Sequence, residues 1–281
     1  MNYGRTQNLN KTLGQAIFLI FMFVLALTMM VPFFWMISSS LKYDAEVFTV
    51  PMRWIPSVIR WENYTEVWNS INFGRYYINS LAVAVAGTSF QLFISCTAAY
   101  AFARIPFRGR GLVFTIYMAT MMVPWHSIMI PQFMVMRFFN LFDSLSALIL
   151  LQGFSAFGIF LLRQFFMGIP VELSEAAKID GCGEFRIFWK IILPQAGPGV
   201  ATLVVFTFTH IFNDYLAPLI YISSRSNYTV QLALRLFETQ FTMQYALIMA
   251  GTVSALAPVF LVFLVCEKYI TQGIVFSGLK G

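Results

Sequence analysis

Six apolar stretches divide this sequence, and each is long enough to cross a lipid bilayer as a helix. A spanning helix needs about 20 mostly apolar residues. Within lipid, a helix is also one of the few structures that satisfies all of its own backbone hydrogen bonds. The sequence therefore predicts an all-α integral membrane protein with six transmembrane helices in a single domain, residues 1–281. The expected spans are Ala16–Ile37, Leu81–Ala103, Leu112–Val135, Leu145–Phe166, Val200–Ile222 and Tyr245–Cys266.

The composition excludes the main alternatives to a membrane protein. Hydrophobic residues make up 59% of the chain and charged residues 11%, whereas a soluble domain carries about 25% charged residues. The net charge of +6 does not indicate a nucleic-acid partner, because no basic run with interleaved aromatic residues is present. We expect no nucleic acid to bind, and we assign the excess of basic residues to inner loops of a membrane protein.

The distribution of basic residues predicts the orientation. If the N-terminus is cytoplasmic, the inner segments carry more Lys and Arg than the outer ones, and Arg104, Arg108 and Arg110 share one short inner turn. Short cytoplasmic loops rich in these residues set topology. We therefore expect both termini in the cytoplasm. The first span is expected to stay in the membrane, because it is longer than the apolar region of a signal peptide.

The longest inner loop, residues 167–198, begins with a pattern that predicts a short helix over residues 169–181. Pro170 suits a first helical turn, and Glu172 and Glu175 favour the positive end of the helix dipole. Gly181 is expected to end this helix, because a residue without Cβ adopts the left-handed cap conformation at little cost.

The second half of the loop predicts another helix. Four large apolar side chains recur at helical spacing and are expected to form one apolar face: Phe185, Phe188, Trp189 and Ile192. Pro194 is expected to end this helix. On periodicity alone, the two helices could simply connect two spans along the inner surface of the membrane.

A specific string within this loop favours a further interpretation. Glu175-Ala176-Ala177, then Gly181, then nine residues and Ile191-Ile192-Leu193-Pro194 resembles the EAA signature of permease subunits of ATP-binding-cassette (ABC) importers. Phe154–Phe166 and Asn213–Leu219 are similar to the carbohydrate branch of these permeases, the second-permease type of the maltose and multiple-sugar family. The resemblance implies a type I ABC importer permease fold, in which residues 167–198 form a coupling loop that docks in the ATPase. The residues implied in this coupling are Glu175, Ala176, Ala177, Asp180, Gly181, Phe185, Leu193 and Pro194.

The resemblance also implies a function and a set of partners. The chain is expected to be a transport subunit of a bacterial cytoplasmic membrane, and not an enzyme. It would translocate a sugar, preferably a di- or oligosaccharide, which an extracytoplasmic solute-binding protein delivers. A homologous second permease and two ATPase subunits would complete the importer, and ATP would bind to the ATPase subunits. Glycerol phosphate-type solutes are the alternative substrate class. Cys182, Phe212 and the pair Trp125-His126 depart from the pattern of the family, and the pair could reshape the pathway.

Two other functional classes find less support in the residues. An integral membrane enzyme would need convergent His, Asp or Glu groups in its loops, and a secondary carrier would need inverted repeats and more intramembrane charge. The sequence has no Gly-rich phosphate loop, so the chain is not expected to bind ATP itself. Cys96, Cys182 and Cys266 lie far apart and form no metal-binding pattern with the two histidines. We expect no catalytic residue, no cofactor and no metal.

Polar residues inside the spans are candidates for the pathway, because ionisable groups in a membrane are costly and commonly functional. Asp214 is the acidic residue deepest in a span, with Asn213 beside it and His210 one turn earlier. Asn213 and Asp214 could bind sugar hydroxyls, or they could satisfy backbone groups freed near Pro218. His126 lies between Pro124 and Pro131, two residues expected to interrupt the third span. It could form a hinge or gate, or it could be a buried histidine with satisfied hydrogen bonds.

Overall fold

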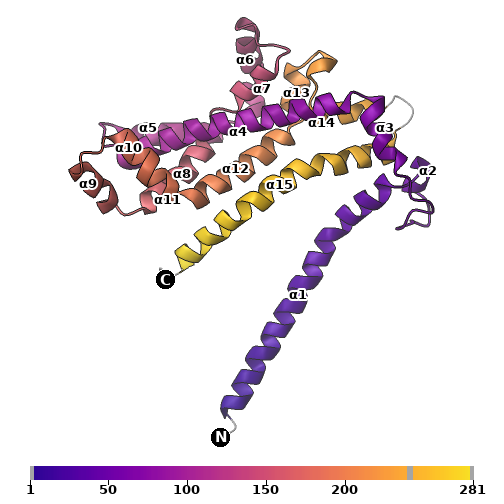
Figure 1. Ribbon diagram of the computed structural model, residues 1–281, viewed down its shortest axis with the longest axis horizontal. Helices are drawn as coiled ribbons and strands as arrows, with labels where there is room; N and C mark the ends of the chain where they lie inside the picture. Colours follow the sequence, from indigo (N-terminus) through magenta and orange to yellow (C-terminus); the bar gives the residue numbers. More distant parts are fainter. Residues whose placement is uncertain (1–2, 239–242, 279–281) are drawn as a thin grey trace. The chain divides into compact units, whose positions relative to one another are not determined.

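The described part of the chain is mainly helical (Figure 1). A computed structural model describes residues 3–238 and 243–278, with the side chains of residues 14–238 and 243–271. No strand longer than the isolated bridge between Glu238 and Met243 lies within these described residues. The predicted all-α fold class is confirmed. The α-helices are α1 (Tyr3–Ser40), α2 (Asp44–Val47), α3 (Glu62–Ser70), α4 (Phe73–Arg104), α5 (Arg110–Ala119), α6 (Trp125–Phe138), α7 (Leu145–Leu151), α8 (Ala156–Gly168), α9 (Glu172–Ile179), α10 (Glu184–Ile187), α11 (Leu193–Gln195), α12 (Gly197–Phe212), α13 (Leu216–Tyr221), α14 (Val230–Ala233) and α15 (Tyr245–Gly278).

Three helical segments of the described chain are long and apolar enough to cross a membrane: Gly14–Ser40, Phe73–Arg104 and Tyr245–Thr271. Three further pairs of helices pass the same test together but are bent by more than 40° at a short break. If each bent pair is one span, the described chain has up to six spans, the number that the sequence predicts. The bounds of the fifth differ, because the bent pair covers residues 184–212 and the predicted span Val200–Ile222 is interrupted after Phe212. The second span is longer than predicted, because α4 begins at Phe73.

The predicted span Leu112–Val135 is broken rather than straight. Its two parts, Arg110–Met122 and Trp125–Phe138, meet at 100°. Pro124 explains the break, because the residue before a proline is pushed out of the helical region and Val123 is indeed extended, with φ −83° and ψ 114°. The second expected interruption is wrong, since α6 continues through Pro131.

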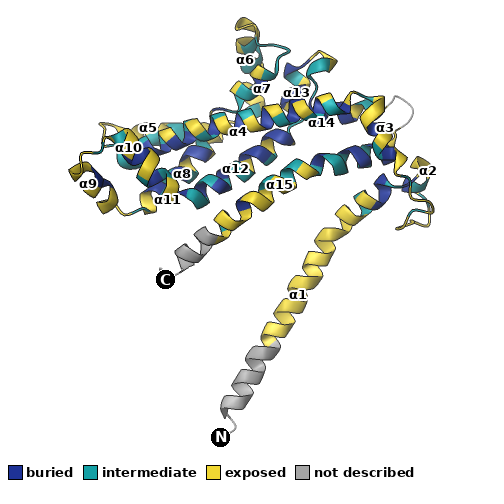
Figure 2. Cartoon of the chain, viewed as in Figure 1, coloured by how far each residue is buried: buried dark blue, intermediate teal, exposed yellow. Residues whose placement is uncertain are grey.

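The described chain forms two compact units: residues 1–70 with 237–254 (unit 1), and residues 71–236 with 255–281 (unit 2). The single permease domain predicted above stays a prediction. In unit 1, the side chains of α1 are exposed from Gly14 to Phe34, as Figure 2 shows in yellow. Such an apolar helix is suited to contact with lipid or with another membrane helix. The side chains of Arg5 and Lys11, which contributed to the predicted orientation, lie outside the described residues.

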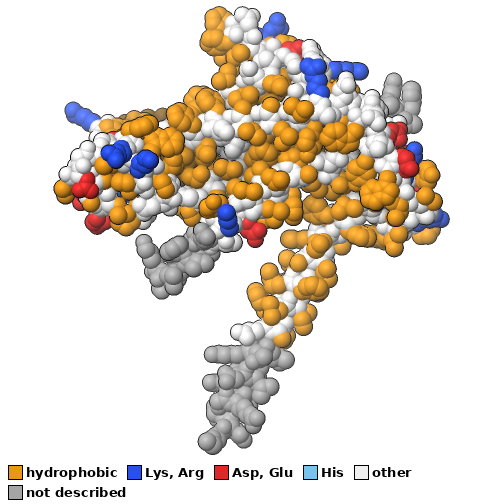
Figure 3. All heavy atoms as spheres, in the orientation of Figure 1, with side chains coloured by type: hydrophobic (Ala, Val, Ile, Leu, Met, Phe, Trp, Pro, Cys, Tyr) orange, Lys and Arg blue, Asp and Glu red, His pale blue; other side chains and the backbone are white. Residues whose placement is uncertain are grey.

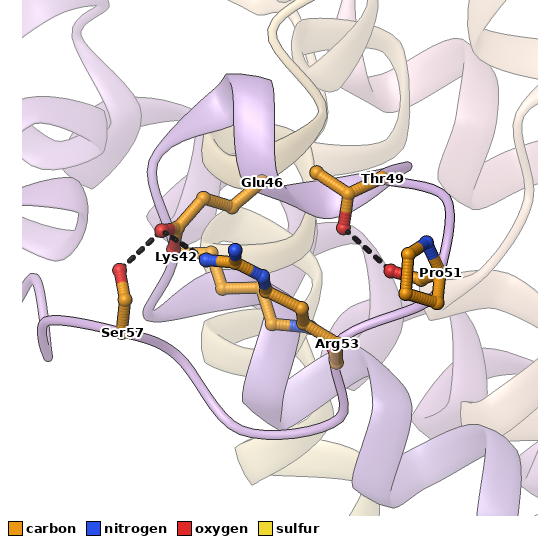
Figure 4. Close-up of polar contacts among 6 residues, drawn as sticks. All are labelled: Lys42, Glu46, Thr49, Pro51, Arg53 and Ser57. Atoms are coloured by element: carbon orange, nitrogen blue, oxygen red, sulfur yellow. Dashed lines mark hydrogen bonds and ion pairs between the residues drawn. The ribbon is translucent and has the colours of Figure 1, made fainter.

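The segment between α1 and α3 in unit 1 is held by a buried lysine. The Lys42 ammonium donates a hydrogen bond of 2.6 Å to the Arg53 carbonyl oxygen and lies 4.0 Å from the centre of the Trp35 ring. Burial lowers the pKa of Lys42, and the charge of Glu46 opposes this shift. Glu46 accepts a hydrogen bond from Ser57 and lies 3.8 Å from Arg53 (Figure 4). The loop between α2 and α3 contains no regular secondary structure, and these contacts hold it in place.

Unit 2 is built around α4, which packs against α7, α8 and α12. The close approach of α8 depends on Gly158, because a Cβ there would lie 2.6 Å from the Ser95 hydroxyl oxygen. The core continues into the predicted coupling loop through Ala177, Ile187 and Phe188. Figure 3 shows apolar side chains over most of the visible surface of the unit 2 helices, as expected for a surface that faces lipid.

Candidate functional site

A cavity of about 690 Å³ lies within unit 2, between segments that are far apart in the sequence. Its wall combines aromatic rings with amides, hydroxyls, imidazoles and one carboxylate. Pockets of about 300–1,000 Å³ are typical of small-molecule sites. The lining residues are Gln91, Trp125, His126, Ile128, Gln132, Leu151, Gln152, Phe154, Ser155, Phe157, Phe206, Thr207, His210, Asp214, Leu216 and Ala217.

Hydrogen bonds orient several polar groups of this wall. The Gln91 side-chain amide on α4 donates to the Thr207 hydroxyl on α12 at 2.9 Å, and both side chains are buried. The Trp125 indole N–H donates to the Gln132 amide oxygen at 3.1 Å, seven residues further along α6. These bonds hold amide groups at the cavity wall, where they can bind a polar solute.

Asp214 makes the backbone contact considered for it from the sequence, while its role in sugar binding stays a prediction. It follows the end of α12, where Asn213, Asp214 and Tyr215 separate α12 from α13. Its Oδ1 accepts a hydrogen bond of 3.2 Å from the Ala217 backbone N–H, so it satisfies a free donor at the start of α13. The same carboxyl group lines the cavity.

The other predicted pathway residues differ in position. His126 is exposed and lines the cavity, so the interpretation as a buried histidine is wrong. Asn213 is exposed but does not line the cavity, and its amide oxygen accepts a hydrogen bond of 3.2 Å from Gln231.

Three glutamines of the cavity wall were missed by the sequence analysis: Gln91, Gln132 and Gln152. The sequence did contain a signal for them, because a polar amide within an apolar span needs a hydrogen-bond partner inside the protein or a water-filled cavity. No group of three His, Cys, Asp or Glu side chains that could hold a metal ion occurs in the described part of the chain.

The first half of the predicted coupling loop folds as a helix with the expected cap. α9 begins at Glu172, two residues after Pro170 rather than with it. Gly181 has φ +78°, the left-handed conformation predicted for it. The N–H of Cys182 donates to the Ala177 carbonyl oxygen at 2.9 Å and the N–H of Gly181 to that of Lys178 at 3.0 Å, the two bonds of a Schellman motif.

The second half of the loop departs from the predicted single helix. It consists of α10, a π-helical turn over Phe188–Ile192 and α11, which ends at Gln195. Phe188 and Ile192 are buried as expected, but Phe185 is 77% exposed. Phe185 still contacts Trp189, with ring centres 6.2 Å apart, and Trp189 contacts Phe188 at 5.3 Å. The aromatic side chains are therefore neighbours as predicted, but two of them, Phe185 and Trp189, remain exposed.

The residues of the EAA-like string point in two directions. Ala177 is buried in the core of unit 2, whereas Glu175, Ala176 and Asp180 are exposed. Ile179, six residues before Phe185, is 88% exposed. Leu193 and Pro194 line a second, apolar cavity of about 460 Å³ together with residues of α4 and α12.

A separate polar cluster joins the loop after α6 to the loop after α13. The Asp143 carboxylate accepts hydrogen bonds of 2.9 Å from the backbone N–H groups of Ser223 and Ser224 and another from the Ser224 hydroxyl. The hydrogen bonds from Ser224, and then from Ser223, lower the pKa of Asp143. Asp143 also has φ +60°, a conformation that Asp and Asn tolerate better than most residues.

Comparison with known proteins identifies relatives over most of the chain. Residues 91–274 match the family "Binding-protein-dependent transport system inner membrane component". The arabinooligosaccharides transport system permease protein AraQ of Bacillus subtilis (strain 168) is 32% identical over 266 residues, which cover 93% of this chain and 94% of AraQ. The sn-glycerol-3-phosphate transport system permease protein UgpE of Yersinia enterocolitica is 36% identical over 242 residues, which cover 83% of this chain and 86% of UgpE.

A solved structure shares the fold. A chain in the crystal structure of a bacterial ABC transporter involved in the import of the acidic polysaccharide alginate matches with a TM-score of 0.80 at 24% identity. The match covers 92% of this chain and 97% of that chain. The predicted fold of an ABC importer permease is therefore confirmed.

Proposed function

Because this chain belongs to the family of binding-protein-dependent transport system inner membrane components, we propose that it carries an uncharged di- or oligosaccharide across the bacterial cytoplasmic membrane. It is a transport subunit and not an enzyme. In this proposal a solute-binding protein delivers the sugar from outside, a second permease completes the pore, and two ATPase subunits supply the work. The cavity of about 690 Å³ is the part of the pathway that this chain contributes.

The chemistry of the cavity wall carries the choice of substrate. Aromatic rings such as Trp125 and Phe206 offer apolar faces to a sugar ring, and Gln91, Gln132 and Gln152 offer amide donors and acceptors to its hydroxyl groups. Among the described residues that line the cavity, none is Lys or Arg. An uncharged polyhydroxylated solute needs no such residue.

Glycerol phosphate-type solutes remain the second candidate, since UgpE is named for sn-glycerol 3-phosphate and is 36% identical to this chain. The cavity disfavours them. A phosphate is best recognised by Arg or by clustered donors, whereas this wall presents the Asp214 carboxylate. Two like charges about 4 Å apart repel by about 1 kcal/mol even in bulk water, and by more in a cavity.

The coupling loop is the proposed contact with an ATPase subunit. Leu173, Ile179 and Phe185 are exposed apolar side chains amid charged neighbours, the pattern of a protein interaction surface rather than of a solvated loop. The sequence has no phosphate-binding loop of its own, so the energy of ATP must reach the cavity through such a contact. In this proposal the loop is cytoplasmic, and because it follows the fourth of six spans, both termini would be cytoplasmic as well.

Uptake by the complete importer in proteoliposomes tests the proposal. Neutral arabino-, malto- and chito-oligosaccharides would be offered with the cognate binding protein, in parallel with sn-glycerol 3-phosphate and an oligo-uronate. We expect ATP-dependent uptake of a neutral saccharide only. Uptake restricted to an anionic solute would contradict the substrate class, and purification of the intact chain without an ATPase subunit would contradict the transport assignment itself.

A further inference from the structure

A chain of two short polar contacts joins the coupling loop to the longest helix of unit 2. The Lys178 ammonium on α9 lies 2.6 Å from Oε1 of Glu184, the first residue of α10. The Tyr100 hydroxyl on α4 donates to Oε2 of the same carboxylate, also at 2.6 Å. Glu184 therefore connects three elements through its two oxygen atoms, and both bonds involve a charged group, which makes them stronger than neutral hydrogen bonds.

The Tyr100 end of this chain is fixed by packing. Tyr100 is 5% exposed, and its ring centre lies 5.0 Å from that of Phe188 and 6.3 Å from that of Phe166. Because a side chain enclosed in this way has little freedom to change rotamer, a displacement of Glu184 must move α4 or break the hydrogen bond.

A second attachment holds the beginning of the same loop to α4. The Arg104 guanidinium, in the last turn of α4, donates to the carbonyl oxygen of Phe166 at 2.6 Å and to that of Ile169. These carbonyl groups lie at the end of α8, where the Phe166 oxygen also accepts the Ile169 N–H and further donors complete the helix end. The loop is thus attached to α4 at its first residues and at its middle, through Arg104 and Tyr100.

The other direction along α4 leads to the cavity. No proline interrupts α4, and Gln91 lies nine residues before Tyr100, about 13 Å away at the helical rise of about 1.5 Å per residue. Gln91 lines the cavity and bonds to Thr207 of α12. A shift of the loop that reaches Tyr100 will therefore displace a group in the cavity wall.

We infer that Tyr100 and Glu184 are positioning residues for coupling, which transmit a displacement of α9 through α4 to the cavity. The inference rests on the proposed function, since it takes α9 as the helix that contacts the ATPase. The two residues touch neither solute nor nucleotide. They act by keeping the loop and α4 in register.

The test uses Tyr100→Phe and Glu184→Gln in the complete importer, reconstituted with its binding protein and ATPase. Both substitutions preserve shape. Tyr100→Phe removes the hydrogen bond to Glu184, and Glu184→Gln removes the charge from the contacts with both Tyr100 and Lys178. We expect the amount of solute transported per ATP hydrolysed to fall roughly tenfold in each variant, as is typical of the loss of a hydrogen bond to a charged group. The transport ratio of the double variant should be no lower than that of the more impaired single variant, because the effects of substitutions within one chain of contacts are not additive.

Tyr117→Phe is the matched control, since Tyr117 of α5 packs against the same core cluster but outside the chain of contacts. Its transport ratio should equal that of the wild type. A wild-type ratio in Tyr100→Phe and Glu184→Gln, additive losses, or an equal loss in Tyr117→Phe would overturn the inference. Co-purification of the ATPase with the wild-type chain separates the two failures. If the ATPase co-purifies and one of these contradicting results is found, only the inference fails. If the ATPase does not co-purify, the proposed function fails as well.

Discussion

The N–H of Cys182 donates to the carbonyl oxygen of Ala177 at 2.9 Å and closes a turn around Gly181. Ala177 is buried in the core of unit 2, whereas Gly181 is exposed. The turn therefore anchors the end of α9 to the core and sets the direction in which the loop continues. Its geometry leads to the first prediction.

Gly181→Leu should lower uptake roughly five- to thirtyfold while the complex stays in the membrane. A Cβ at this position meets nothing within 4 Å, so crowding is not the cause. The cause is φ +78°, since a left-handed conformation costs a residue with a side chain about 1–2 kcal/mol. Uptake per amount of complex measures the effect. Gly181→Asn is the control and should retain most of the activity, because Asn tolerates this conformation; equal losses in both variants would count against the turn.

Asp214→Asn should preserve assembly, because an amide oxygen can still accept the hydrogen bond from the Ala217 N–H. It should also weaken the rejection of anions. Calorimetric titration of the purified importer with a neutral trisaccharide and a tri-uronate, without binding protein, measures both affinities. We expect the affinity for the tri-uronate to rise by about fivefold or more, because the removed repulsion is at least about 1 kcal/mol.

The affinity for the neutral trisaccharide should change little in the same titration. Asp143→Asn is the control, since it removes a carboxylate that does not line the cavity. A tri-uronate affinity that is identical in the wild type and in Asp214→Asn would assign Asp214 to structure alone.

Labelling of the native cysteines should report the orientation and the docking of the coupling loop. Cys96 and Cys266 are 5% and 9% exposed, whereas Cys182 is partly exposed after the turn at Gly181. A membrane-impermeant maleimide requires water access to the sulfur. We expect Cys182 to react in inside-out vesicles stripped of the ATPase, and to be protected when the ATPase is restored.

No labelling of Cys182 is expected in intact cells, and Cys182→Ser should abolish the signal in the vesicles. Reaction from outside the cell would reverse the proposed topology. Protection that does not depend on the ATPase would leave the topology intact and refute the docking site.

Asp143→Asn should lower the thermal stability of the protein at neutral pH, and the difference from the wild type should disappear in acid. Asn keeps the left-handed backbone conformation, so the variant isolates the carboxylate. The pKa of Asp143 is lowered in the folded protein by hydrogen bonds from Ser224 and Ser223. Because the pKa is lowered on folding, the carboxylate stabilises the protein fully at pH values above its pKa in the unfolded chain, near 3.8. This stabilisation is lost as the pH falls through the lower pKa of the folded protein.

Melting temperatures of both proteins between pH 8 and pH 3 would show this dependence, with a constant difference down to about pH 5 and a smaller one below about pH 4. A difference that shrinks between pH 8 and pH 6 would point to another titrating group.

Much of the fold follows from local rules that a sequence displays directly. The lengths of the apolar runs predict the spans, Pro124 predicts the break before α6, and Gly181 predicts the left-handed end of α9. Each of these depends on backbone sterics or on the thickness of a bilayer, and hence on neighbouring residues alone. The same rules failed at Pro131, where α6 continues, and at Phe185, which is exposed although its spacing predicted a buried apolar face.

The sites depend on contacts between residues that are far apart in the chain. Gln91 meets Thr207 across 116 positions, and Tyr100 meets Glu184 across 84; neither pair has a spacing that a periodic pattern could reveal. Asp214 and His126 were candidates because a polar group in an apolar span is costly, but their places in one cavity wall come from the packing of α6, α12 and α13. Sequence periodicity thus determines which segments are helices, and only tertiary packing determines which polar groups those helices bring together.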